Sequence, residues 1–209
     1  LLRLAQLCLD AGLPPGVLNV VTGTGAEAGE ALARHMDVDI MTFTGSGLVG
    51  RMLLKASAES NLKRVYLELG GKSPNIVFSD APDLAQAAKV SALGIYRNSG
   101  QVCVAGSRLL VQREVHDEFV ERLHNIAAKL RVGDPLDVST EIGAVSSARQ
   151  LAKNLMAVQT AQIEGARLVV GGQALHPIEG GNYMAPALFD GVTPNMTLAR
   201  EEVFGPVLA

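Results

Sequence analysis

Residues 64–74 read Arg-Val-Tyr-Leu-Glu-Leu-Gly-Gly-Lys-Ser-Pro, and residues 98–106 read Asn-Ser-Gly-Gln-Val-Cys-Val-Ala-Gly. The first run is rich in β-branched and aromatic residues and stops at a Gly-Gly pair, so it predicts a strand that ends in a turn at Gly70. Glu68 then lies at the carboxyl end of that strand, where open α/β sheets bind their ligands. Cys103 lies in a loop of small residues before a second apolar run, Leu109–Val111. The two stretches therefore predict an α/β fold with a carboxylate and a thiol in Gly-rich loops at strand ends.

A thiol and a carboxylate held in this way can divide covalent acyl chemistry between them. The thiol of Cys103 would attack a carbonyl carbon, and the carboxylate of Glu68 would accept and return protons. The residues alone do not require this, because most free cysteines are small buried core residues. A glutamate after a strand is also usually a solvated strand end. Taken alone, the residues favour packing over catalysis.

Four separated motifs change that balance. Both runs resemble signatures of the NAD(P)-dependent aldehyde dehydrogenase superfamily, and so do the runs 43–46 (Phe-Thr-Gly-Ser) and 201–206 (Glu-Glu-Val-Phe-Gly-Pro), in the same order and spacing. The resemblance extends over essentially all 209 residues. It implies that Cys103 is the nucleophile and Glu68 the general base in the oxidation of an aldehyde to a carboxylic acid. The intermediates on Cys103 would be a thiohemiacetal and then a thioester.

The same resemblance implies a bound NAD or NADP. The helix that opens at Ser46 would bind the cofactor pyrophosphate with its N–H groups, although an N-cap serine explains this residue equally well. Glu202 would bind the nicotinamide ribose, and Phe204 would pack beside the nicotinamide ring. The alternative for Glu202 is a solvated surface carboxylate without a functional role. The loop containing Gly25 would lie beside the adenine. The full expected cofactor-binding set is Gly25, Phe43, Gly45, Ser46, Leu69, Gly70, Gln150, Lys153, Glu202 and Phe204.

The hydrophobic pattern predicts the order of elements and two domains. Residues 1–69 are predicted as the C-terminal half of an NAD(P)-binding domain with a parallel, Rossmann-like sheet. Its strands are expected at 17–21, 39–43 and 64–69. Its helices are expected at 1–13, from just after residue 25 to about residue 34, and from residue 46 onward. Residues 70–209 are predicted as the thiol-bearing α/β domain, incomplete at its end. Its expected helices are 84–96, 115–130, 150–163 and 196–202; its expected strands are 75–78, 108–112, 168–170 and 184–189, with a surface loop at 174–181.

Composition excludes several other classes of function. The formal net charge is -3 and no basic cluster appears, so a nucleic-acid partner is not expected. No apolar run is long enough to span a bilayer, and the two cysteines, Cys8 and Cys103, indicate a reducing compartment, taken as cytoplasmic. The four histidines show no ligand spacing, so no metal site is expected. Lys72 and Arg108 are expected to be structural ion-pair partners.

Both ends of the chain look cut within elements, so the sequence is expected to be an internal fragment. The family's oxyanion-binding Asn and ribose-binding Lys would lie upstream of Leu1. We expect the isolated fragment to be inactive and weakly folded, and the resemblance implies a homodimer or homotetramer for the full-length protein. Two alternatives remain open: a dehydrogenase that transfers the acyl group to coenzyme A, which the presence of Glu68 disfavours, and a non-catalytic NAD-binding relative.

Overall fold

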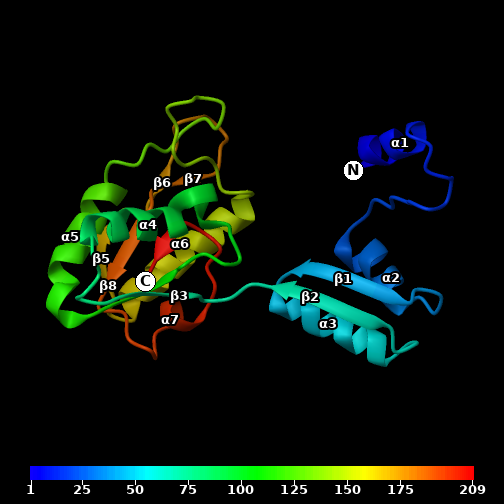
Figure 1. Cartoon of the computed structure of the whole chain (residues 1–209), viewed down its shortest axis with the longest axis horizontal. Helices are drawn as coiled ribbons and strands as arrows, with labels where there is room; N and C mark the ends of the chain where they lie inside the picture. Colours follow the sequence, from blue (N-terminus) through cyan, green and yellow to red (C-terminus); the bar gives the residue numbers. More distant parts are fainter. The chain divides into compact units, whose positions relative to one another are not determined.

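The structure, a computed structural model, describes residues 1–209 as two compact units, Leu1–Leu69 and Gly70–Ala209. Each unit combines helices with parallel strand pairs (Figure 1), which confirms the predicted α/β class. None of the helices has the length and apolar character needed to cross a membrane.

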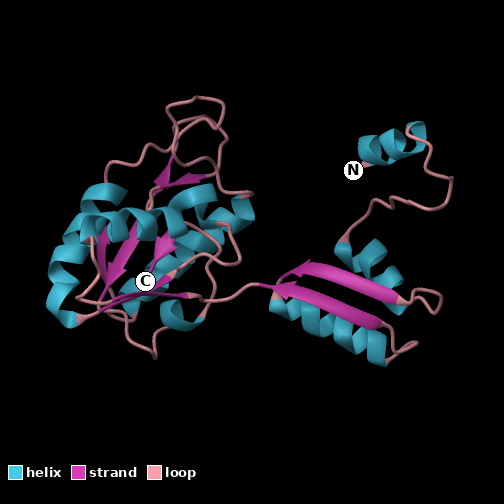
Figure 2. Cartoon of the chain, viewed as in Figure 1, coloured by secondary structure: helices cyan, strands magenta, loops and turns pink.

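The first unit is built around one pair of parallel strands. β1 (Ile40–Gly45) pairs with β2 (Arg64–Leu69), and helix α3 (Gly47–Ala58) connects them in a βαβ unit (Figure 2). A Cβ on Gly50 would contact the side chains of Leu67 and Leu69, so a glycine here lets α3 pack tightly on β2. The unit also contains α1 (Leu2–Asp10) and a π-helical turn (Gly25–Gly29) that continues into α2 (Glu30–Arg34).

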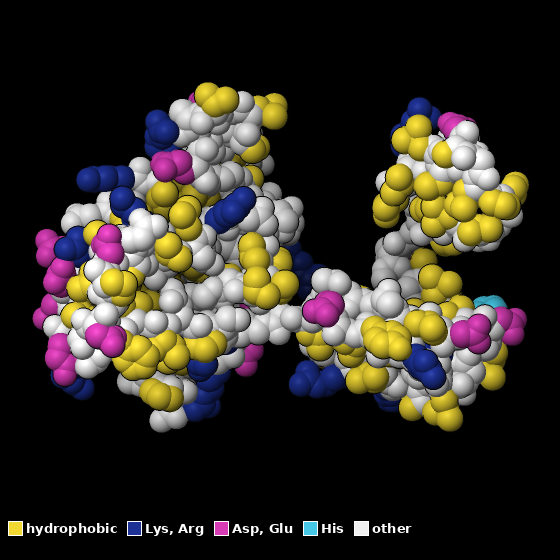
Figure 3. Space-filling view, viewed as in Figure 1, with side chains coloured by type: hydrophobic (Ala, Val, Ile, Leu, Met, Phe, Trp, Pro, Cys, Tyr) yellow, Lys and Arg dark blue, Asp and Glu magenta, His cyan; other side chains and the backbone are white.

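The prediction of a strand over residues 17–21 is wrong. These residues form turns and irregular backbone, and the only sheet of this unit contains β1 and β2 alone. An apolar run becomes a strand only when another strand accepts its backbone hydrogen bonds, and here none does. The side chains of Val17 and Val21 are exposed, as are the leucines of α1, which form a yellow patch in Figure 3.

The second unit contains three small sheets and four helices, three of them long. The helices are α4 (Leu84–Tyr96), α5 (His116–Ala127), α6 (Ala148–Ile163) and α7 (Thr197–Arg200). Parallel strands β3 (Pro74–Val77) and β4 (Arg108–Val111) form one sheet. A second has the order β5-β8-β9, from Arg167–Val170, Ala187–Asp190 and Val207–Leu208. The third pairs β6 (Ala174–Leu175) with β7 (Tyr183–Met184).

The end of β9 connects the first two of these sheets. Ala209 accepts a hydrogen bond from the N–H of Leu109 (2.7 Å) and donates one to the carbonyl of Ser107 (3.1 Å). Helices α4 and α5 cover this region and bury Tyr96, Phe119 and Leu123 almost completely. The helix predicted over 115–130 is present as α5, and the core that it forms with α4 fixes the positions from which the thiol loop leaves α4.

Two expectations for this unit need correction. The segment 174–181 is not wholly a loop, because Ala174 and Leu175 pair with β7. The strand expected over 184–189 is two strands, β7 and β8, interrupted at Ala185 and Pro186. Proline has no N–H to donate to a neighbouring strand, so it ends the first pairing before the second begins.

Candidate active site

In the first unit, the expected cofactor residues gather at the carboxyl edge of the β1–β2 sheet. The parallel register places Thr44 opposite Glu68 and Gly45 opposite Leu69, so the turns that follow both strands leave the same edge. The ring of Phe43 lies over Gly45, where a Cβ would overlap it. Glu68 is exposed and makes no side-chain hydrogen bond or ion pair within the chain. Its carboxylate is therefore free to act on a ligand at this edge.

Ser46 is confirmed as the N-cap of α3. Its Oγ accepts a hydrogen bond from the N–H of Val49 at 3.4 Å, and its own backbone is extended. A capping side chain satisfies only one of the N–H groups at the start of a helix, so the others still face outward with the positive end of the helix dipole. Gly25 lies elsewhere on this unit, in the π-helical turn, with open space where a Cβ would be.

In the second unit, Cys103 lies on a loop with an unusual backbone. Asn98, Ser99 and Gly100 follow α4 with φ values of 53°, 54° and 69°, all in the left-handed region. Glycine adopts that region readily and asparagine does so occasionally, so the strained member of the three is Ser99. The loop delivers Cys103 to the surface as an exposed free thiol. The backbone N–H of Cys103 donates to no acceptor in the chain, so it is available to an incoming ligand.

Glu202 and Phe204 follow α7 in the same unit. The carboxylate of Glu202 lies against Gly70, where a Cβ would overlap it, and it accepts no hydrogen bond from the chain. Phe204 has a φ of 58° and is partly exposed. Both side chains are therefore presented by a tightly turned segment rather than buried in the core.

Helix α6 holds this segment through two of the expected residues. The side-chain amide of Gln150 donates to the carbonyls of Val203 (2.8 Å) and Phe204 (3.2 Å). One helical turn later, Nζ of Lys153 donates to the carbonyl of Glu202 at 3.3 Å. In this structure both residues thus support the backbone that carries Glu202 and Phe204.

One small crevice brings the second unit's candidates together. Its lining includes Gly71, Gly100, Val102, Glu202 and Phe204, so the start of the unit, the thiol loop and the Glu202 segment share its walls. Gly100 is required at this point, because a Cβ would overlap the carbonyl of Gly205. The carboxylate of Glu202 and the ring of Phe204 line the crevice, and Cys103 directly follows Val102, one of its wall residues. The sequence had no local pattern that would predict this contact between residues 100 and 205.

The expectation that Lys72 and Arg108 form structural ion pairs is wrong. Neither residue makes a salt bridge, and Lys72 Nζ and Arg108 Nε are buried without hydrogen-bond partners. The pKa of Lys72 is lowered to about 8, mainly by burial and also by the nearby positive charge of Arg108, while Glu202 opposes both effects. The sequence indicated the charges but not that they lie beside each other.

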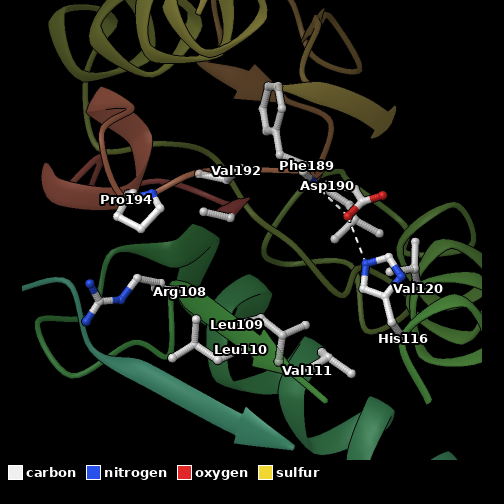
Figure 4. A pocket seen from close by; sticks show the side chains of 14 residues that line it. Arg108, Leu109, Leu110, Val111, His116, Val120, Phe189, Asp190, Val192 and Pro194 are labelled. Atoms are coloured by element: carbon white, nitrogen blue, oxygen red, sulfur yellow. Dashed lines mark hydrogen bonds and ion pairs between the residues drawn. The ribbon is translucent and has the colours of Figure 1, made fainter. Parts of the chain in front are cut away.

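The largest hollow of this unit lies elsewhere and contains none of the predicted site residues. It measures about 570 Å³ and lies between β4 and β8 (Figure 4). At its edge His116 Nε2 contacts Asp190 Oδ1 at 2.9 Å, and His116 Nδ1 contacts Asp117 Oδ1 at 2.8 Å. No group of three or more His, Cys, Asp or Glu side chains is arranged to hold a metal ion.

Comparison with known proteins settles the family. The model of the aldehyde dehydrogenase family matches residues 1–209. The chain belongs to the aldehyde dehydrogenase family. The NADP/NAD-dependent aldehyde dehydrogenase PuuC of Escherichia coli (strain K12) is 48% identical over 207 residues, covering 99% of this chain and 41% of PuuC. Aldehyde dehydrogenase 1A1 of Gallus gallus is 44% identical over 206 residues, covering 99% of this chain and 40% of the chicken protein.

Solved structures of aldehyde dehydrogenases have the same fold. The crystal structure of indole-3-acetaldehyde dehydrogenase with NAD+ matches with a TM-score of 0.96 and 49% identity, over 99% of this chain and 42% of that one. Aldehyde dehydrogenase KauB from Pseudomonas aeruginosa matches with a TM-score of 0.95 and 49% identity, again over 99% and 42%. The chain thus spans about two fifths of the length of these relatives.

Two residues that support this candidate site were not predicted. Ser99 is 3% exposed and its hydroxyl donates to the carbonyl of Gly143 at 2.8 Å, which fastens the thiol loop. Asn154 is fully buried beneath Gly205, where a Cβ would overlap its side chain. For Asn154 a signal existed: it follows Gln150 by four residues and therefore shares its helix face. For Ser99 there was none, because a left-handed backbone at a serine is not visible in composition.

Proposed function

We propose that the protein containing this chain oxidises an aldehyde to a carboxylic acid with NAD or NADP, and that Cys103 is its nucleophile. The single observation that carries this proposal is the exposed thiol of Cys103 on a loop with left-handed backbone, since Gly100 and Val102 of the same loop line a crevice together with Glu202 and Phe204. Backbone strain of about 1–3 kcal/mol per residue persists where the surroundings enforce it, and it is concentrated at functional sites. A cysteine that served only packing would be buried.

The chemistry begins at the sulfur. A thiol has an ordinary pKa of about 8.5, and its thiolate form attacks the aldehyde carbon to give a tetrahedral thiohemiacetal with a negatively charged oxygen. The free N–H of Cys103 is available to donate to that oxygen. Loss of one such donor typically costs about 3 kcal/mol in the transition state. The carbon then gives up a hydride and becomes the carbonyl carbon of a thioester on Cys103.

The chain's residues fit a dinucleotide that accepts this hydride. The carboxylate of Glu202 has no partner within the chain and can accept hydrogen bonds from ribose hydroxyls, while the partly exposed Phe204 lines the same crevice. In the first unit, the outward N–H groups at the start of α3 suit a pyrophosphate. PuuC is named as NADP/NAD-dependent, and the indole-3-acetaldehyde dehydrogenase was solved with NAD+. On these grounds we assign Leu1–Leu69 to the NAD(P)-binding domain and Gly70–Ala209 to the catalytic domain.

Glu68 completes the cycle in this proposal. Its carboxylate takes a proton from water, and the resulting hydroxide adds to the thioester carbon. The C–S bond then breaks, which releases the carboxylic acid and returns Cys103 to the thiolate. Glu68 is exposed, so it can reach a water molecule, and it forms no competing ion pair in the chain. An assembly of two or four copies is proposed from family resemblance alone.

The test uses the full-length protein with a panel of aldehydes, followed by NADH absorbance and product analysis. Cys103→Ala should abolish oxidation of every aldehyde, whereas Cys8→Ala should leave the rate within about twofold. The product should be the free acid, with or without coenzyme A. If acyl-coenzyme A is formed instead, the thioester is resolved by transfer of the acyl group to coenzyme A and not by hydrolysis. NAD binding without turnover of any aldehyde would show a non-catalytic relative.

A further inference from the structure

The loop before Cys103 is held in a high-energy conformation by named contacts. Asn98, Ser99 and Gly100 are three consecutive residues with φ between 53° and 69°. For an L-residue such as Ser99 the left-handed region is unfavourable, because Cβ comes too close to the following carbonyl oxygen. Ser99 adopts this conformation although it is unfavourable, and only 3% of the residue is exposed. Contacts with the surrounding residues must therefore offset the cost of the left-handed backbone.

These contacts come from two sides. On one side, the hydroxyl of Ser99 donates to the carbonyl of Gly143 at 2.8 Å, and the side-chain carbonyl of Gln101 accepts from the N–H of Ser146 at 3.1 Å. On the other side, Gly100 packs directly on the carbonyl of Gly205. The amide of Asn98 closes the loop internally by donating to the carbonyl of Gln101 at 3.0 Å.

Both of these sides are connected to the beginning of helix α6. Residues 143–146 lead into it, and Ser147 caps its first turn by accepting from the N–H of Gln150 at 3.2 Å. The side chain of that same Gln150 holds the carbonyls of Val203 and Phe204, just before Gly205. The beginning of α6 therefore fixes the thiol loop and the Glu202–Phe204 segment at once.

We propose that Ser99 is a positioning residue for the reaction. Its hydroxyl ties the thiol loop to the segment that opens α6, and this sets Cys103 in register with the segment that carries Glu202 and Phe204. The proposal rests on the proposed role of Cys103 as nucleophile. Ser99 is the only member of the left-handed triplet that is buried with a side-chain bond to another segment. Without that bond the loop can relax toward ordinary φ values, which turns both the sulfur and the N–H of Cys103.

A misplaced nucleophile slows chemistry more than it weakens binding, because positioning contributes chiefly to the transition state. The informative variant is Ser99→Gly, which removes the hydroxyl but adopts a positive φ without strain. We expect kcat for aldehyde oxidation by the full-length protein to fall about tenfold or more, with KM for the aldehyde and for NAD within about twofold. Ser146→Ala is the matched control, because its contribution to the loop is a backbone N–H that the substitution keeps.

Alkylation by iodoacetamide separates positioning from loss of structure. This reagent needs only a reachable thiolate, so Cys103 in Ser99→Gly should react within about twofold of the parent rate, with Cys8 as reference in the same molecule. Unchanged kcat in Ser99→Gly would overturn the proposal, and so would an equal fall in kcat and in Cys103 alkylation. If Cys103→Ala retains activity, the proposed function itself fails, which is a separate outcome.

Discussion

The carboxylate of Glu202 lies directly against the α-carbon of Gly70, although 132 positions (202 − 70) separate the two residues. A side chain at position 70 would occupy the space that the carboxylate fills. Gly70 is thus needed for the close approach of Glu202, and its backbone flexibility is not required, because its φ is not positive. This contact relates two of the four family motifs directly to each other.

Gly70→Ala should weaken cofactor binding with little effect on stability. The atoms in the way belong to the end of a flexible side chain, so Glu202 swings aside at small cost to folding while its carboxylate leaves its place. We expect the Kd for NAD to rise roughly tenfold, as for loss of a charged hydrogen bond, and the free energy of unfolding to change by less than about 1 kcal/mol. Gly71→Ala is the control, since no atom lies within 4 Å of its added Cβ. Equal Kd values for the two variants would remove Glu202 from the cofactor site.

Gly100→Ala should destabilise the second unit strongly. The added methyl would overlap the backbone carbonyl of Gly205, which cannot swing away, and φ at this position is 69°. Strain and overlap together should cost about 3 kcal/mol in denaturant unfolding. Gly94→Ala makes the same chemical change on an exposed turn of α4 with open space around it, so it should stabilise by about 0.5–1 kcal/mol. A loss of less than about 1 kcal/mol for Gly100→Ala would mean that the thiol loop is not packed as described.

Lys72 makes stability depend on pH in the alkaline range. Its pKa is lowered from 10.5 to about 8, so between these values the unfolded chain binds more protons than the folded one. The free energy of unfolding should therefore rise as pH rises from about 8 toward 10.5, by about 3 kcal/mol at most. Lys72→Met removes the buried charge and should flatten this rise. A variant whose unfolding follows the parent at every pH would show that Lys72 is solvated.

His116 produces the opposite dependence at lower pH. The hydrogen bond to Asp117, and to a smaller extent the one to Asp190, raise the pKa of His116 above its ordinary 6.5. Partial burial of the ring lowers the pKa but does not cancel this effect. Its stabilising charge is present below pH 6.5 and is lost as pH rises through the folded-state pKa. The free-energy difference between the parent and His116→Gln should therefore shrink from pH 6 to pH 8. A constant difference would indicate that the contacts of His116 with Asp117 and Asp190 do not require a protonated imidazole. The ion pair between Asp190 and Arg167 does not change in this pH range, because Arg167 remains charged throughout.

Much of the fold could be predicted because its determinants are local. Ser46 caps α3 and Asp83 caps α4 through contacts three residues away, which sequence spacing shows directly. The strand expected at 17–21 could not be judged in this way, because a strand depends on a partner far along the chain. The same applies to Lys72 and Arg108, whose burial without counter-ions is set by tertiary packing.

The candidate site likewise combines residues that the sequence indicated with residues whose role depends on tertiary contacts. Motif resemblance indicated Gln150 and Lys153, and the structure adds that they hold the backbone of residues 202–204. Ser99 was missed although it lies inside a quoted motif, because its importance comes from a left-handed φ and from a carbonyl 44 residues away. Propensity predicts the common backbone conformation for each residue, so it fails where a site enforces a rare one.

The most direct test of the account is the fate of the sulfur during turnover. Glu68→Gln in the full-length protein should still form the thioester but hydrolyse it slowly, so incubation with propanal and NAD should leave a propanoyl group on the peptide that contains Cys103. Mass spectrometry of the digested protein would locate it, and hydroxylamine should release it. We expect Cys103 to be acylated and Cys8 to remain unmodified. Continued aldehyde oxidation with no acyl group on Cys103 would contradict it.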